Sequence, residues 1–174
     1  PRFPWSNWTR PEAESNPLAL QDRRPGEPPL SCALRPLIGL YDSGDPEIAR
    51  WHVRLAQAAG IDAFLASWWG DFKERDRAFE SGILAAAEEL DFKIALLDER
   101  AQFHHDFAAY QAMLAAALAK YKDSPAYLRI DGRPVVYLYQ IGKDPGLSAE
   151  EFPALRGAVE AKVGPVYWIV DKLA

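Results

Sequence analysis

From residue 41 onward, helix-length amphipathic segments alternate with short apolar runs, and this alternation constrains the fold more than any other feature of the sequence. Apolar side chains recur along one face of three segments, which predicts helices over 46–59, 74–90 and 107–121, and a capping box predicts a fourth over 149–162. The runs between and after them have the length and composition of buried strands: 63–68, 93–97, 135–139 and 167–170. Such alternation is typical of a parallel sheet covered by helices.

Capping signals indicate where two of these helices begin and end. Asp45 is a suitable N-cap for the first helix, with Pro46 at its first position, and Gly60 follows its last turn. Ser148 and Glu151 have the spacing of a capping box at the start of the last helix. Helix and strand boundaries can therefore be predicted from local chemistry as well as from periodicity.

The alternation leaves two architectures to compare. If residues 3–5 form a first strand, the chain holds five strands, which a doubly wound sheet could also accommodate. That fold needs a ligand motif at its switch point, and the sequence contains neither G-x-G-x-x-G nor a P-loop. We therefore predict an α/β fold of the (β/α)8 TIM-barrel type. Because such a barrel needs about 250 residues, the chain should cover about its first five β/α units.

In this interpretation residues 1–174 form a single barrel domain that is incomplete on its C-terminal side, with an irregular Pro-rich loop over 10–36. The first residues show neither an initiator Met nor a signal-peptide pattern, so we expect the natural N-terminus to lie upstream. The compartment stays open, and a periplasmic or secreted location is compatible with the sequence.

Composition and charge exclude several classes of function. The net charge is −5 and no basic cluster stands out, which is atypical of a nucleic-acid binder. No run approaches the roughly 20 apolar residues of a membrane span. Cys32 is the only cysteine, and His52, His104 and His105 lack zinc-ligand spacing. The sequence thus predicts neither a metal site nor a cofactor.

Aromatic and acidic residues gather where the predicted strands end. In barrels, working residues lie at the C-terminal ends of strands. The residues at or after those ends are Trp5 and Trp8, Trp68, Trp69 and Asp71, Asp98 and Glu99, Tyr139 and Gln140, and Asp171 and Lys172. Aromatic rings can stack on sugars, and carboxylates serve as acid, base or nucleophile in glycosidases. Asp71 and Asp171 also suit a purely structural role as helix caps.

Strand geometry divides these residues further. Consecutive side chains point to opposite faces of a strand, so one of Trp68 and Trp69 should face the barrel interior and the other the helix layer. For the same reason, the side chains of Asp98 and Glu99 should diverge. Asp171 should lie two strands from Glu99, roughly 10 Å away, which makes these two acids the alternative catalytic pair within the chain.

Two stretches of the chain resemble glycoside hydrolase family 99, the endo-α-mannosidases and their bacterial relatives, and the related WbsX-like domains of polysaccharide loci. The first runs from PLIGLYDSGDP (36–46) through AGID (59–62) to SWWG (67–70). The second joins YKDSPAY (121–127) to GRPVVYLY (132–139). The order and spacing of these motifs carry the resemblance, which covers about residues 37–140.

The resemblance implies a (β/α)8 barrel that cleaves internal α-mannosidic linkages with retention, through a 1,2-anhydro sugar. The family's two catalytic glutamates lie in a later W-N-E-W-x-E segment that this chain lacks, so no catalytic residue is assigned here. The part carried over is a sugar-binding wall of Trp68 or Trp69, Glu99 and Tyr139. Gln140, and Arg100 after Glu99, depart from the family pattern.

The resemblance thus implies a retaining endo-glycosidase for α-linked mannose-type glycans, which we expect to be inactive as residues 1–174 alone. Its partners would be an oligo- or polysaccharide and the remainder of its own barrel. The alternatives are a WbsX-like, transferase-associated domain of polysaccharide biosynthesis, or a carbohydrate-binding fragment without catalysis.

Overall fold

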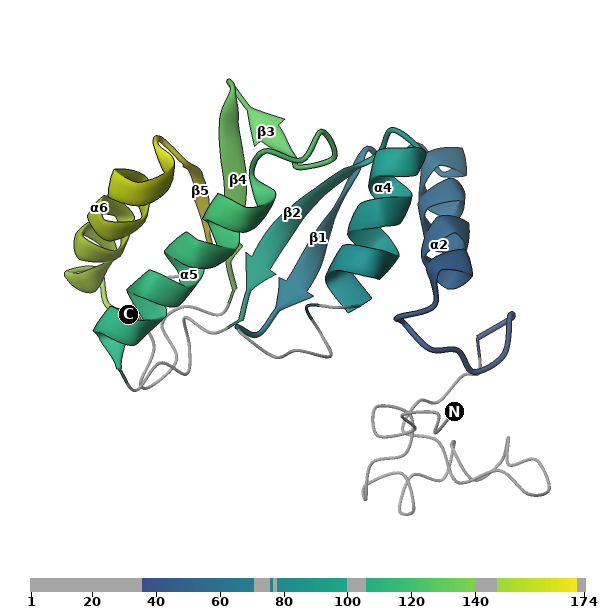
Figure 1. The fold of residues 1–174 in the computed structure, drawn as a ribbon, viewed down its shortest axis with the longest axis horizontal. Helices are drawn as coiled ribbons and strands as arrows, with labels where there is room; N and C mark the ends of the chain where they lie inside the picture. Colours follow the sequence, from purple (N-terminus) through teal and green to yellow (C-terminus); the bar gives the residue numbers. More distant parts are fainter. Residues whose placement is uncertain (1–35, 71–75, 77, 100–105, 140–146, 172–174) are drawn as a thin grey trace, which may run out of the picture.

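The computed structural model describes residues 36–70, 76, 78–99, 106–139 and 147–171. Within these ranges the chain forms one parallel sheet with helices against one face (Figure 1). The parallel strands are β1 (Ala63–Trp68), β2 (Lys93–Asp98), β4 (Arg133–Leu138) and β5 (Tyr167–Val170). They confirm the predicted strands to within two residues at each end. The predicted first strand at 3–5 and the loop over 10–35 lie outside the described residues.

The order of the strands decides between the two candidate architectures. β1 pairs with β2, β2 with β4 and β4 with β5, all in parallel. Parallel neighbours in the chain are therefore neighbours in the sheet, and the described part has no switch point of the kind a doubly wound fold requires. This arrangement is that of an arc of a (β/α)8 barrel.

The helices end within two residues of their predicted limits, and three of them also begin there; the start of the helix predicted over 74–90 falls at residues outside the described ranges. They are α2 (Pro46–Ala58), the π-helical turn η3 (Phe79–Leu84) running into α4 (Ala85–Glu89), α5 (Phe107–Tyr121) and α6 (Glu151–Val163). The Asp45 carboxylate caps α2 by accepting from the Glu47 N–H at 2.9 Å. The Ser148–Glu151 capping box forms, although α6 begins two residues later than predicted. α2 packs beside α4, and α5 beside α6 (Figure 1).

The core lies between the sheet and the helices. Ile94 and Leu96 of β2 and Val136 and Leu138 of β4 are fully buried on this side. On the opposite face of β1, Leu65 is 41% exposed. A β-strand alternates its side chains between faces, so the exposed positions mark the face that a closed barrel would turn inward.

A short hairpin precedes β4 and was absent from the sequence prediction. β3 (Arg129–Ile130) pairs antiparallel with the first two residues of β4. Asp131 and Gly132 join the two strands with φ of 51° and 73°. Positive φ at both central residues is the requirement of a tight I′ hairpin turn, for which Asp-Gly is well suited. Strand β4 therefore starts at Arg133, two residues before the strand predicted over 135–139.

The hairpin inserts Tyr127 between the starting halves of β2 and β4. The Tyr127 hydroxyl donates to the Val135 carbonyl at 2.9 Å and accepts from the Leu96 N–H at 3.4 Å. It thereby bridges backbone groups that direct pairing would otherwise satisfy. Direct pairing of β2 with β4 is confined to Leu96–Asp98, the end where the candidate site lies.

No helix in the described part of the chain is long and apolar enough to cross a membrane.

Candidate functional site

The sheet continues for one residue beyond the C-terminal ends of three strands. The Glu99 N–H donates to the Trp68 carbonyl at 3.0 Å, and the Tyr139 N–H donates to the Asp98 carbonyl at 3.0 Å. The Asp171 N–H donates to the Leu138 carbonyl at 3.2 Å. These residues follow helix-facing positions, so the pleat directs their side chains to the inner face of the arc.

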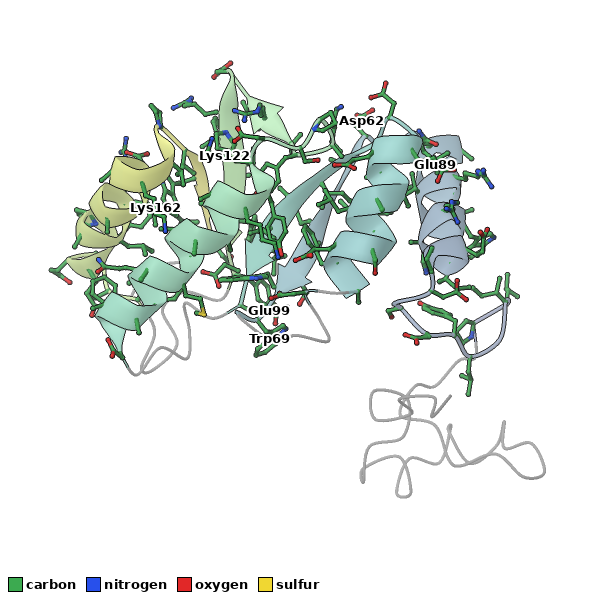
Figure 2. All side chains as sticks on the ribbon, viewed as in Figure 1. Asp62, Trp69, Glu89, Glu99, Lys122 and Lys162 are labelled. Atoms are coloured by element: carbon green, nitrogen blue, oxygen red, sulfur yellow. The ribbon has the colours of Figure 1, made fainter. Side chains whose placement is uncertain are left out.

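Trp69 and Glu99 lie next to each other at this edge, at the ends of β1 and β2 (Figure 2). Ser67 connects them: the Trp69 indole Nε1–H donates to Ser67 Oγ at 3.0 Å, and the Ser67 hydroxyl donates to Glu99 Oε1. An aromatic ring and a carboxylate are thus held side by side on the inner face.

Trp68 takes the opposite direction from Trp69. Its side chain is 5% exposed and belongs to the hydrophobic core between the sheet and α5. Trp69 is half-buried at the edge of the sheet. The sequence prediction that one of the two tryptophans faces the helices and the other the barrel interior is confirmed, with Trp68 on the helix side and Trp69 on the inner face.

Asp98 and Glu99 diverge in the same way. Asp98 is fully buried, and the Tyr110 hydroxyl of α5 donates to its Oδ2 at 2.5 Å. Burial raises the pKa of Tyr110 well above its usual value, and the negative charge of Asp98 raises it further. Asp98 therefore ties α5 to the end of β2 and does not face the candidate site.

Tyr139 and Asp171 extend the inner edge across the next two strands. Tyr139 is half-buried after β4, and Asp171 is exposed after β5. Since neighbouring strands lie about 4.8 Å apart, Asp171 is roughly 10 Å from Glu99 around the sheet. The remaining residues named from the sequence, Trp5, Trp8, Cys32, Asp71, Arg100, His104, His105, Gln140 and Lys172, lie outside the described residues.

A cleft of about 490 Å³ adjoins Trp69, between the end of β1, α2 and η3. Tyr41, His52 and Ser67 line it together with Trp69. The His52 ring meets Tyr41 edge-to-face at 5.3 Å, as expected for a helix residue that contacts a neighbouring loop. Burial lowers the pKa of His52, which favours its neutral form.

Sequence reasoning missed Ser67 and Tyr41 as site residues. Ser67 had one available signal: it lies two positions before Trp69 and therefore shares its face of the strand. Tyr41 lies in the first stretch that carries the resemblance, but its contact with His52 depends on how the loop folds over α2. Within the described ranges, no three His, Cys, Asp or Glu side chains gather as metal ligands would.

Residues 4–148 match the family model of glycosyl hydrolase family 99. The chain belongs to this family. The match covers both stretches on which the sequence resemblance rests. The comparison with curated proteins gives no match.

Solved structures similar to this chain include a member of the same family. The GH99 endo-alpha-mannosidase from Bacteroides thetaiotaomicron is 21% identical, with a TM-score of 0.58 over 75% of this chain and 46% of that one. Its complex with bis-tris propane gives 20% identity and a TM-score of 0.56, over 88% of this chain and 54% of that one. A glycoside hydrolase-like protein is 22% identical, with a TM-score of 0.59 over 78% and 46%.

This chain spans about half the length of those structures. At such identities the likeness establishes the fold, and it agrees with the strand order in assigning the described part to a (β/α)8 barrel. In the family 99 chain, the Trp69–Ser67–Glu99 group therefore stands at the C-terminal edge of the barrel strands, where barrel enzymes place their active sites.

Proposed function

We propose that the full-length protein is a glycoside hydrolase that cleaves α-linked mannose-type glycans at internal linkages with retention of configuration. The observation that carries this proposal is the Glu99 carboxylate, held beside the Trp69 indole on the inner face of the barrel edge. A flat aromatic ring next to a hydrogen-bond acceptor suits a pyranose, which offers an apolar face and a rim of hydroxyl groups.

In this proposal Trp69 stacks against a sugar ring, Glu99 accepts hydrogen bonds from sugar hydroxyls and Tyr139 continues the wall on the next strand. The sequence named Trp68 alongside Trp69 as a wall residue. Because Trp68 is buried in the core, the proposal assigns the contact to Trp69 alone.

The catalytic acids are proposed to lie on later strands of the full-length protein. Retaining glycosidases with a carboxylate nucleophile hold two carboxyl groups about 5 Å apart, and Glu99 and Asp171 are roughly 10 Å apart by strand spacing. Purified residues 1–174 should accordingly hydrolyse no α-mannoside. Activity of these residues that Glu99→Gln or Asp171→Asn abolishes would instead assign the chemistry to this pair.

The direct experiment assays the full-length protein on α-1,2- and α-1,3-linked manno-oligosaccharides and follows the product anomer by NMR. Glu99→Gln should lower kcat/KM at least about tenfold, because a charge-assisted hydrogen bond contributes roughly 1.5–3 kcal/mol. Glu89→Gln is the control, since Glu89 ends α4 near the N-terminal ends of the strands, away from Glu99, and pairs there with Arg50 (Figure 2). Binding without cleavage would support the carbohydrate-binding alternative, and loss of neither binding nor activity in Glu99→Gln would contradict the proposed site.

A further inference from the structure

Ser67 lies at the meeting point of two strands on the inner face. It shares this face with Trp69, two residues later, because side chains alternate along a strand. Ser67 pairs in register with Leu97, two residues before Glu99, and the Glu99 backbone N–H continues the ladder to Trp68. The three polar groups therefore converge because of strand register, although Ser67 and Glu99 are 32 residues apart in the chain.

The donors and acceptors of Trp69, Ser67 and Glu99 fix the direction in which hydrogen bonds run through the three residues. An indole has one N–H donor and no acceptor, whereas a serine hydroxyl has one O–H donor and two lone pairs. The Trp69 N–H occupies one lone pair of Ser67 Oγ, and the Ser67 O–H is committed to Glu99 Oε1. The chain of donors thus runs from Trp69 through Ser67 to the Glu99 carboxylate.

We propose that Ser67 is a positioning residue, which fixes the Trp69 ring and the Glu99 carboxylate relative to each other so that both contact the same sugar. This inference rests on the proposed function. Glu99 Oε1 accepts from the Ser67 hydroxyl, and a carboxylate has further lone pairs that can accept from a sugar hydroxyl. Because hydrogen bonds in a chain polarise one another, loss of the Ser67 hydroxyl disturbs both ends at once.

If Ser67 had a merely structural role, its substitution would change thermal unfolding at least as much as ligand binding. Ser67 is exposed near the C-terminal end of β1, at the edge where the barrel opens, and substitutions at such positions leave stability nearly unchanged. Ser67→Ala should therefore alter ligand binding more than thermal unfolding. Ser67→Thr restores a hydroxyl on a residue that strands tolerate well, and it is the variant expected to recover binding.

The structure also offers a matched control. The Ser124 hydroxyl donates to Glu88 Oε1 at 2.7 Å, between the segment after α5 and α4. Ser124→Ala removes a serine–glutamate hydrogen bond of the same kind outside the strand ends that form the candidate site. Trp69→Phe keeps an aromatic ring while deleting the indole donor, and it identifies the Trp69 N–H signal by its loss from the NMR spectrum.

The test uses the full-length, 15N-labelled protein with an α-1,3-linked manno-oligosaccharide as probe. Ser67→Ala should weaken binding about tenfold, Ser67→Thr should recover it to within about threefold and Ser124→Ala should leave it unchanged. In the ligand-free protein, the Trp69 indole N–H signal should shift in both Ser67→Ala and Glu99→Gln, and stay in place in Ser124→Ala.

If the Trp69 indole N–H signal does not shift in Glu99→Gln, the inference is overturned, because Ser67 would then transmit no effect of Glu99 to Trp69. Equal losses of binding in Ser67→Ala and Ser67→Thr would also overturn it. If the unsubstituted protein binds no manno-oligosaccharide, the proposed function fails, and the indole signal alone then decides whether Ser67 couples the two groups.

Discussion

Two faces of the same sheet give adjacent, chemically similar residues opposite environments. Trp68 is buried against the helices and Trp69 stands at the open edge. Asp98 accepts a hydrogen bond from Tyr110 in the core, whereas Glu99 accepts one from Ser67 on the inner face. The comparison shows that the position of a residue in the strand alternation, rather than its type, decides whether its side chain packs in the core or lies on the inner face of the arc.

The largest effect expected from this comparison is a difference between the two tryptophans. Trp68→Ala should lower the free energy of unfolding by about 3–5 kcal/mol, because it removes a large buried side chain and leaves a cavity. Trp69→Ala should change it by less than about 1 kcal/mol while abolishing saccharide binding. Denaturant unfolding and calorimetric titration of the full-length protein measure the two quantities. Equal destabilisation by both variants would contradict the division of faces.

The second effect concerns the buried acid. Tyr110→Phe should destabilise the protein by roughly 1.5–3 kcal/mol, since a buried carboxylate loses a hydrogen-bond donor. Glu99→Gln should leave stability almost unchanged, because its carboxylate lies on the inner face at the C-terminal edge of the sheet, outside the hydrophobic core. Thermal unfolding of the two variants beside the unsubstituted protein sharpens the comparison, and a larger loss in Glu99→Gln would reverse it.

Alkaline pH gives a further distinction. The pKa of Tyr110 is raised in the folded protein, so its contribution to stability is fully present below the ordinary tyrosine pKa of about 10 and is lost as pH rises above that value. Burial likewise raises the pKa of Tyr127, which bridges β2 and β4. Unfolding free energies between pH 8 and pH 11 should fall less steeply in Tyr110→Phe than in the unsubstituted protein. An unchanged slope would argue that Tyr110 is not buried against Asp98.

The smallest effect is expected at His52, beside the cleft. Its pKa is lowered by burial, so the stability it contributes is present above the unfolded histidine pKa of about 6.5 and is lost as pH falls through the folded value. The unsubstituted protein should therefore lose slightly more stability than His52→Gln between pH 7 and pH 5. A steeper loss in His52→Gln would show that His52 is not desolvated.

Local chemistry in the sequence was sufficient for the helices and for the alternation of strand residues. The Asp45 cap and the Ser148–Glu151 box both depend on residues within one helical turn. Alternation predicted that Trp68 and Trp69 would point to opposite faces of the strand, but it did not indicate which of them would face the helices. Which of the two faces the helices depends on how β1 pairs with β2, where Trp68 lies beside Asp98, and this pairing joins distant segments of the chain.

The features that were not predicted from the sequence all depend on tertiary contacts. Tyr127 bridges two strands only because the β3–β4 hairpin brings it between them. Ser67 reaches Glu99 only through the register of β1 with β2. Periodicity along one segment carries no information about such register, so these residues resembled ordinary strand and loop positions until the sheet was assembled.

The most direct test of the division of faces follows the tryptophan indole N–H signals of the full-length protein while an α-1,3-linked manno-oligosaccharide is added. Trp68→Phe and Trp69→Phe identify the two signals that matter. The account predicts that the Trp69 signal shifts with saturation, while the Trp68 signal stays in place beneath α5. A shift of the Trp68 signal larger than that of Trp69, or no shift of Trp69 at saturating saccharide, would contradict it.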